Sequence, residues 1–137
     1  MSIVLKAANA MYATKDFISF PQREAIKDFV YGEEGPFFAE KLVELQNIIG
    51  DMPKSYETDG QGEEAIAYLH YFKNGWDWYI TEKDAEDDQQ QAFGLVSGHE
   101  VELGYISIAE LTAKGVEAEL DLHWTPKTLR EIKEELK

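Results

Sequence analysis

Cysteine is missing from the 137-residue sequence. Its absence excludes disulfide bonds, zinc sites with cysteine ligands and catalysis by a thiol. A chain without disulfides fits the cytoplasm, so we expect that location. The sequence also lacks any apolar run near the roughly 20 residues that span a bilayer. Its start, MSIVLKAANAM, lacks the layout of a signal peptide, and we interpret it as the first part of the fold.

Basic residues are scarce. Lysine and arginine number 13 against 27 aspartates and glutamates, so the formal net charge is −14. A surface of this sign repels phosphate backbones, which argues against direct binding of nucleic acid. The charge favours solubility or a basic protein partner, and no membrane partner is expected.

Known catalytic motifs are absent as well. The sequence has no His-Glu-x-x-His zinc motif, no glycine-rich phosphate loop and no Gly-x-Ser-x-Gly nucleophile motif. The leading interpretation therefore includes no catalytic residue, no cofactor and no metal site. The alternative is an enzyme or a metal-dependent domain that works through carboxylates and histidines. Its candidate residues are Glu82, Asp84, Glu102, Asp121 and His123, and His70 is a further candidate for acid–base work beside Glu82, Asp121 and His123.

The N-terminal part, residues 1–50, has the periodicity of helices. Apolar residues recur at three- and four-residue spacing in VLKAANAM, PQREAIKDFV and PFFAEKLVELQNII. Pro21 and Pro36 suit first helical turns, and Gly50 suits a helix end. Residues 51–64 are rich in glycine, proline and polar residues, which predicts a long loop.

Residues 65–137 have the pattern of a sheet and a closing helix. Asn74-Gly75 between the β-prone runs AIAYLHYF and WDWYIT predicts a hairpin. Further strands are predicted at QAFGLVS and EVELGYIS. The alternation of VEAELDLHW, residues 116–124, predicts an antiparallel strand with one solvated face.

The closing helix is predicted over TPKTLREIKEELK, with Thr125 as its N-cap and Pro126 in its first turn. The order of elements predicts an α+β fold. Its antiparallel sheet, of four to five strands in the C-terminal half, packs against the N-terminal helices and the C-terminal helix. The length suits a single domain over residues 1–137.

Five carboxylates crowd into seven residues after the hairpin. Clustered carboxylates bind Ca²⁺ or Mg²⁺ through oxygen ligands, but this spacing is not that of an EF-hand loop. The alternative is a solvated loop between strands. In the leading hypothesis these acids form part of a charged contact surface: Glu82, Asp84, Glu86, Asp87 and Asp88.

A second acidic group lies on the last predicted strand. Side chains two residues apart on a strand stand about 6.6 Å apart, so Glu117, Glu119 and Asp121 are expected to form an evenly spaced row. Glu100 and Glu102 are expected to extend it from a neighbouring strand. Such a row imitates phosphates and suits the basic groove of a nucleic-acid-binding protein. The alternative is the ordinary solvated face of an acidic protein.

Most aromatic residues of the sheet half are expected in the core. Trp78 and Trp124 are different, because we expect them near a margin of the sheet. Tryptophan dominates the centres of protein interfaces, so these two residues are candidate anchors for a partner.

Four segments occur here in the order WDWYITEKD, QAFGLVSG, ELGYISIAEL and ELDLHWTPKTL. Together they resemble an uncharacterised domain family of phages and conjugative plasmids, over about residues 65–133. The upstream segment LVELQNIIGDMPKSYETDGQG resembles a version of this domain found inside very large multidomain phage proteins. Some of those proteins counter host restriction.

The resemblance implies an α+β fold, an origin in a mobile element and residence in a bacterial host. The segment between Phe93 and Glu102 is short here, where many relatives carry a longer glycine-rich loop. The signature positions that this sequence shares with the family are Thr81, Glu82, Asp84, Phe93, Gly94, Glu102, Leu103, Gly104, Tyr105, Ser107, Glu110, Leu111, Asp121 and Trp124.

Charge and resemblance together give the leading hypothesis. The chain is a non-catalytic acidic binding protein of a phage or plasmid, and it occupies a basic surface on a host defence nuclease or a CRISPR effector. One alternative is a carboxylate-based metal-binding or hydrolytic domain. Another is a structural or packaging module of a phage particle.

Overall fold

Three helices form the N-terminal part of the molecule. The structure is a computed structural model that describes residues 2–137. Ser2 caps the first helix, because its side chain accepts a hydrogen bond from the backbone N–H of Leu5 at 3.1 Å. Proline stands in the first turn of the next two helices, as predicted. The helices are α1 (Ile3–Thr14), α2 (Phe20–Val30) and α3 (Gly35–Asp51), and α3 continues through Gly50, where the sequence predicts its end.

A five-stranded antiparallel sheet forms the C-terminal part, in the order β5-β4-β3-β2-β6. The predicted hairpin is confirmed, because Asn74 and Gly75 have φ angles of 51° and 85° and join two paired strands. The strands are β2 (Leu69–Lys73), β3 (Trp76–Glu82), β4 (Ala92–Ser97), β5 (Val101–Ile106) and β6 (Glu119–Leu120). A separate pair joins β1 (Ile66–Ala67) to β7 (Lys127–Thr128).

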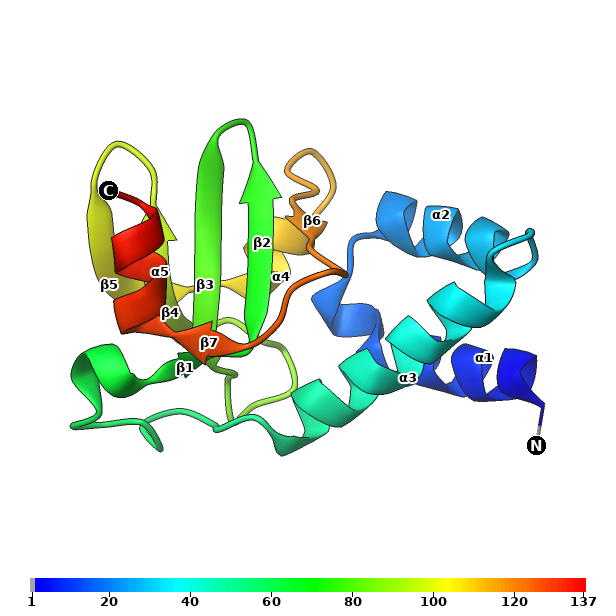
Figure 1. Cartoon of the computed structure of the whole chain (residues 1–137), viewed down its shortest axis with the longest axis horizontal. Helices are drawn as coiled ribbons and strands as arrows, with labels where there is room; N and C mark the ends of the chain where they lie inside the picture. Colours follow the sequence, from blue (N-terminus) through cyan, green and yellow to red (C-terminus); the bar gives the residue numbers. More distant parts are fainter. Residues whose placement is uncertain (1) are drawn as a thin grey trace.

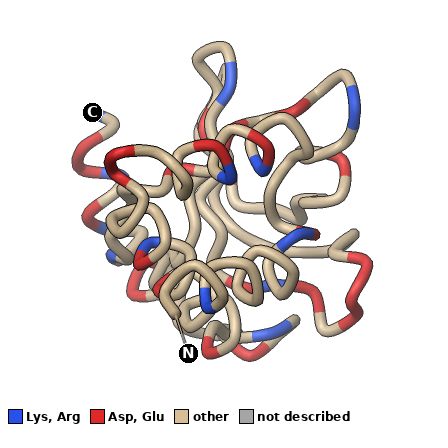
Figure 2. The backbone as a smooth tube through the Cα atoms, turned by 90° about the vertical axis from the view of Figure 1, so that its right-hand side faces the viewer, with Lys and Arg blue, Asp and Glu red and all other residues tan. Residues whose placement is uncertain are grey.

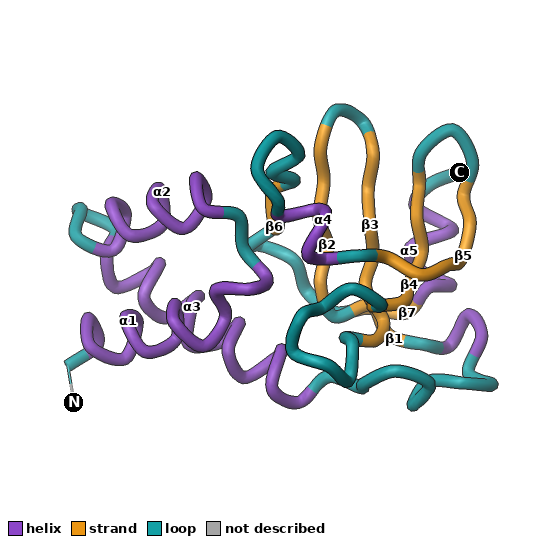
Figure 3. The backbone as a smooth tube through the Cα atoms, turned by 180° about the vertical axis from the view of Figure 1, so that it is seen from behind, coloured by secondary structure: helices purple, strands orange, loops and turns teal. Residues whose placement is uncertain are grey.

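The two faces of the sheet are covered differently (Figures 1 and 3). One face carries Tyr79 and Leu95, which pack with Leu129 and Ile132 of α5 (Leu129–Glu135). The other face carries the fully buried Tyr71, which belongs to a core shared with α1, α3 and α4 (Ile108–Thr112). Figure 1 shows α1, α2 and α3 as a group at one end, with α3 running from that group towards the sheet.

A side chain of α2 closes the edge of the sheet at β6. The amide nitrogen of Gln22 donates to the backbone carbonyl of Leu120 at 2.8 Å, and its amide oxygen accepts from the N–H of Leu120 at 2.9 Å. Gln22 therefore takes the place that a sixth strand would occupy beside Leu120. This contact holds the helical group against the sheet and covers part of an edge that would otherwise be open.

The strand predicted over residues 116–124 is wrong in its extent. Glu117 has a φ of 51°, so the chain turns there and only Glu119 and Leu120 pair with the sheet. Val116, which the alternation places in the core, is 40% exposed. A left-handed residue breaks the period-two pattern of a strand, and the row of side chains that depends on it is broken too.

The closing helix begins later than predicted. Its N-cap is Thr128 rather than Thr125. The hydroxyl of Thr128 accepts from the N–H of Glu131 at 3.2 Å, and the Glu131 side chain accepts from the N–H of Thr128 at 3.4 Å. This reciprocal capping box needs a glutamate or glutamine three residues after the cap. Thr125 has Thr128 at that position, so it cannot form one.

The predicted fold class is confirmed. Helices, an antiparallel sheet in the C-terminal half and a C-terminal helix form an α+β fold. No helix within residues 2–137 is long and apolar enough to cross a membrane.

Candidate functional site

Glu82 lies at the end of β3 with its carboxylate turned inward, and the residue is 5% exposed. One oxygen accepts the N–H of Tyr56 at 2.8 Å. The other accepts the N–H of Thr58 at 2.9 Å and the hydroxyl of the same residue. A loop without regular structure needs acceptors for its buried N–H groups, and Glu82 supplies them. The prediction that places Glu82 on an acidic surface is therefore wrong.

Asp84 is also buried, at 9% exposure, and the prediction that it belongs to the surface is wrong for the same reason. One of its oxygens accepts the N–H of Glu86 at 3.0 Å. The other accepts the N–H groups of Gln90 and Gln91 at 3.1 and 2.9 Å. Asp84 thus organises the loop that joins β3 to β4.

The other acids of this predicted surface lie in separate places. Figure 2 shows acidic positions spread over several loops and helices of the backbone. β5 and β6 form opposite edges of the sheet, so residues near β5 cannot extend a row that starts on β6. That part of the prediction is wrong. The exposed acids of these segments are Glu86, Asp87, Asp88, Glu100 and Glu102.

A groove of about 560 Å³ separates α2 from β6 and the segment after it, and we call it the α2–β6 groove. Glu117, Glu119 and Asp121 line one wall. The structure therefore brings the three acids of the predicted row together in one concave surface, although it does not space them evenly. Residues of α2 form the opposite wall. No pattern in the sequence indicates that α2 faces these acids.

The apolar lining of the α2–β6 groove includes three phenylalanines. Phe29 stacks on Phe38 with ring centroids 4.7 Å apart, yet it remains 51% exposed. Phe72 of β2 is 36% exposed and lines the same groove. An aromatic surface that stays open beside carboxylates provides both stacking and charge to a partner.

The groove acids have no lysine or arginine of their own. Within residues 2–137, no such side chain forms an ion pair with Glu117, Glu119 or Asp121. The nearby Lys73 donates instead to the backbone carbonyl of Val116. The charges of Glu117 and Glu119 therefore have no partner of opposite sign within residues 2–137.

Asp121 also belongs to a cluster around His70. The two ring nitrogens of His70 face Asp121 at 3.0 Å and Asp77 at 2.7 Å. The imidazole stacks on Tyr79 with centroids 4.7 Å apart. Burial, followed by the charge of Asp77, raises the pKa of Tyr79 to about 12. The two carboxylates and the ring of Tyr79 therefore fix the orientation of the His70 imidazole within the fold.

Asp77 was not predicted as a partner of His70. The hairpin register carries the missing signal. Tyr79 lies opposite His70, so Asp77, two residues before Tyr79, lies diagonally across from His70 on the same face.

Apart from His70 and Asp121, which contact each other, the residues of the enzymatic alternative lie in separate places. Glu82 and Asp84 hold two loops, Asp121 binds His70, and the ring of His123 lies beside Phe37 with centroids 6.0 Å apart. No group of three or more acids and histidines within residues 2–137 is arranged to hold a metal ion.

The two candidate anchors are half-buried. Trp124 donates from its indole nitrogen to the carbonyl of Ala67 at 3.0 Å, and its ring packs on Tyr79. Trp78 stacks on Trp76 with centroids 6.1 Å apart and packs against the main core. Both rings are thus used within the fold, and neither lines the α2–β6 groove.

A smaller hollow of about 220 Å³ lies between β5 and the loop held by Glu82. The hydroxyl of Tyr105 donates to that of Tyr56 at 3.3 Å, and this interaction raises the pKa of Tyr105. Five signature positions of the resemblance line the hollow: Thr81, Glu82, Phe93, Leu103 and Tyr105. Two of them, Glu82 and Tyr105, attach the loop to the sheet through their hydrogen bonds to Tyr56 and Thr58.

Comparison of the chain with protein-family models, with curated proteins and with solved structures found no match in any of the three. The resemblance to a phage and plasmid family therefore stays a prediction. The α2–β6 groove is the candidate functional site, because it combines an open aromatic lining with two carboxylates, Glu117 and Glu119, that have no partner of opposite sign within residues 2–137.

Proposed function

We propose that the chain is a non-catalytic binding module of a phage or plasmid, and that it recognises a basic surface of another protein through the α2–β6 groove. A defence nuclease or a CRISPR effector of the host is a partner of this kind. Occupation of the nucleic-acid-binding surface of such a protein would inhibit it.

One observation carries the proposal. Glu117 and Glu119 face a groove lined by phenylalanines and have no cationic partner within residues 2–137. A guanidinium that enters this groove forms charge-assisted hydrogen bonds with the carboxylates and stacks on an aromatic ring. An arginine side chain of a partner would therefore contact the carboxylates and a phenylalanine ring of the groove at the same time.

The geometry also favours one mode of recognition. Because Glu117 lies in a turn, the acids do not repeat at the even spacing of a phosphate backbone. We therefore propose that the groove receives individual basic side chains rather than imitating a length of DNA. The remaining negative charge of the chain speeds the encounter with a positively charged partner.

The test begins with capture of partners from bacterial lysate on the immobilised chain, followed by affinity measurements with the captured protein. The double variant Glu117→Gln/Glu119→Gln removes two groove charges, and Phe72→Ala removes an aromatic contact. The matched control, Glu86→Gln/Asp87→Asn, removes two exposed charges outside the groove. We expect both groove variants to weaken binding by about tenfold or more and the control by less than about threefold.

Equal losses from the groove pair and the control pair would show that net charge, not the groove, determines binding. A second result would also count against the proposal. If affinity does not fall between about 0.05 M and about 0.5 M salt, the contact is not electrostatic.

A further inference from the structure

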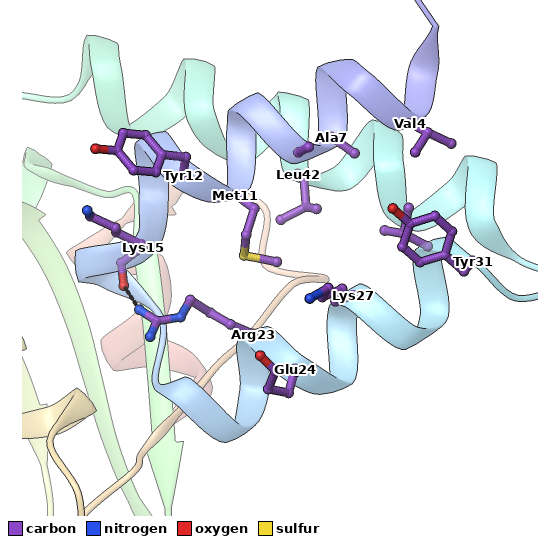
Figure 4. Close-up of a pocket in the computed structure, with 12 residues that line it drawn as sticks. Val4, Ala7, Met11, Tyr12, Lys15, Arg23, Glu24, Lys27, Tyr31 and Leu42 are labelled. Carbon is purple, nitrogen blue, oxygen red and sulfur yellow. Dashed lines mark hydrogen bonds between the residues drawn. The ribbon is translucent and has the colours of Figure 1, made fainter.

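A pocket of about 370 Å³ lies between the first three helices (Figure 4). Its volume is in the lower part of the range of roughly 300–1,000 Å³ for small-molecule sites. Apolar side chains from all three helices form its lining: Val4, Ala7 and Met11 of α1, Val30 of α2 and Leu42 of α3. Figure 4 shows Met11 extending from α1 into the space above α2.

The rim of this helical pocket is basic. Lys15, Arg23 and Lys27 line it, against the single acid Glu24. Within residues 2–137 none of the three cations forms an ion pair. Arg23 donates to the carbonyl of Lys15 at 2.6 Å, which fixes its guanidinium at the rim (Figure 4). Positive charge at this rim is therefore available to a ligand.

This basic rim contrasts with the rest of the chain. Residues 1–31 contain four lysines and arginines and three acids, whereas residues 32–137 contain nine and 24. The whole negative excess of the protein thus lies outside the segment that supplies the pocket rim. An anion repelled elsewhere on the surface is attracted here.

Two tyrosines flank the helical pocket. Tyr12 and Tyr31 are 72% and 71% exposed, and both line it. Lys15 lies over the ring of Tyr12 at 4.2 Å from the centroid. Large rings left open beside an apolar hollow provide surface that a bound apolar body would cover.

We propose that the helical pocket binds a small amphipathic anion: a medium-length acyl chain with a carboxylate head. The acyl chain lies against Met11, Val30 and Leu42. The head is at the rim, where Lys27 and Arg23 donate hydrogen bonds to it. This binding activity is distinct from recognition of a basic protein, because it uses another surface and the opposite charge.

Methyl-labelled methionine provides the readout. The sequence has three methionines, of which Met11 lines the pocket and Met52 lies in the core at 2% exposure. Met11→Leu assigns the Met11 signal. Titration with decanoate should move that signal in a saturable way and leave the Met52 signal unchanged. Shortening the ligand to octanoate should weaken binding by roughly fourfold for each methylene removed.

Paired variants separate the contribution of the carboxylate head from that of the acyl chain. Lys27→Gln should raise the Kd for decanoate by roughly fivefold to tenfold, whereas Lys6→Gln, which removes an exposed lysine of α1 outside the pocket, should not. Ala8→Leu fills the pocket from an exposed position and should abolish binding. Ala13→Leu is its control, because Ala13 is exposed on the same helix and does not line the pocket.

Three results would overturn the proposal. The first is a Met11 signal that decanoate does not move. The second is decanol binding as tightly as decanoate, since the charged head would then contribute nothing. The third is sedimentation of the chain with phosphatidylglycerol vesicles, because the anion would then be a membrane surface rather than a free molecule.

Discussion

Two pairs of carboxylates have opposite surroundings in this molecule. Glu82 and Asp84 are buried and accept hydrogen bonds from backbone N–H groups of neighbouring loops. Glu117 and Glu119 line an open groove and have no cationic partner among residues 2–137. The first pair maintains the fold, and the second is available to another molecule.

The difference shows what decides the role of an acid in a highly charged chain. A carboxylate that finds several N–H donors is stabilised inside, even without a lysine or arginine nearby. A carboxylate on a wall without such donors keeps its hydration and its charge for a partner. The number of acidic residues in the sequence therefore overstates the acidic surface of this protein, because Glu82 and Asp84 are buried.

The largest effect on stability is expected at the buried pair. Glu82→Ala leaves the N–H groups of Tyr56 and Thr58 without their acceptor, so we expect the free energy of unfolding to fall by about 3 kcal/mol. Urea denaturation measures this loss, and limited proteolysis should cut the loop at 53–62 faster. Glu86→Ala, at an exposed position, should change stability by less than about 0.5 kcal/mol. Equal losses for the two variants would mean that Glu82 is not an anchor.

Asp84→Ala should give the next largest loss, about 2 kcal/mol, because three backbone N–H groups of the β3–β4 loop lose their acceptor. Asp84→Asn should not restore stability. Both Asp84 oxygens accept backbone N–H groups, so the amide nitrogen of asparagine would face a donor in either orientation. Full recovery with asparagine, measured by urea denaturation, would contradict this account.

A long-range contact between Gln22 and Leu120 joins the two walls of the α2–β6 groove. Gln22→Ala removes both side-chain hydrogen bonds to Leu120, and we expect it to destabilise the protein by about 1.5 kcal/mol. Amide exchange at Leu120 should accelerate more than exchange at the centre of β3. Gln46→Ala, at an exposed position of α3, is the matched control. An unchanged exchange rate at Leu120 would show that Gln22 does not hold α2 against β6.

Local rules predicted most of the fold correctly. Asn74-Gly75 needs positive φ at both residues, and the hairpin follows from that requirement. Pro21 and Pro36 stand in first helical turns because a missing N–H is tolerated there. The predicted start of the last helix is three residues too early, because the prediction places the N-cap at Thr125 although Thr128 and Glu131 have the spacing of a capping box.

The candidate site was predicted only in part, because its decisive contacts are long-range. The Glu82 carboxylate accepts from donors 24 and 26 residues away, which no local pattern indicates. Alternation placed Glu117, Glu119 and Asp121 on one surface, and they do share a groove. The left-handed turn at Glu117 and the opposite wall from α2 depend on how the chain folds back, so the spacing rule alone could not supply them.

The smallest effect is expected at the groove pair, and it has the opposite sign. Glu117→Gln/Glu119→Gln removes two unpaired charges from a chain of net charge −14, so repulsion within the native state decreases. We expect a gain in stability of up to about 0.5 kcal/mol at low salt. The gain should disappear near 1 M salt, where the screening length is about 3 Å. Urea denaturation at the two salt concentrations measures this difference. A loss of more than about 1 kcal/mol in the free energy of unfolding would instead show that these acids stabilise the fold, as Glu82 and Asp84 do. Their charges would then not be available to a partner.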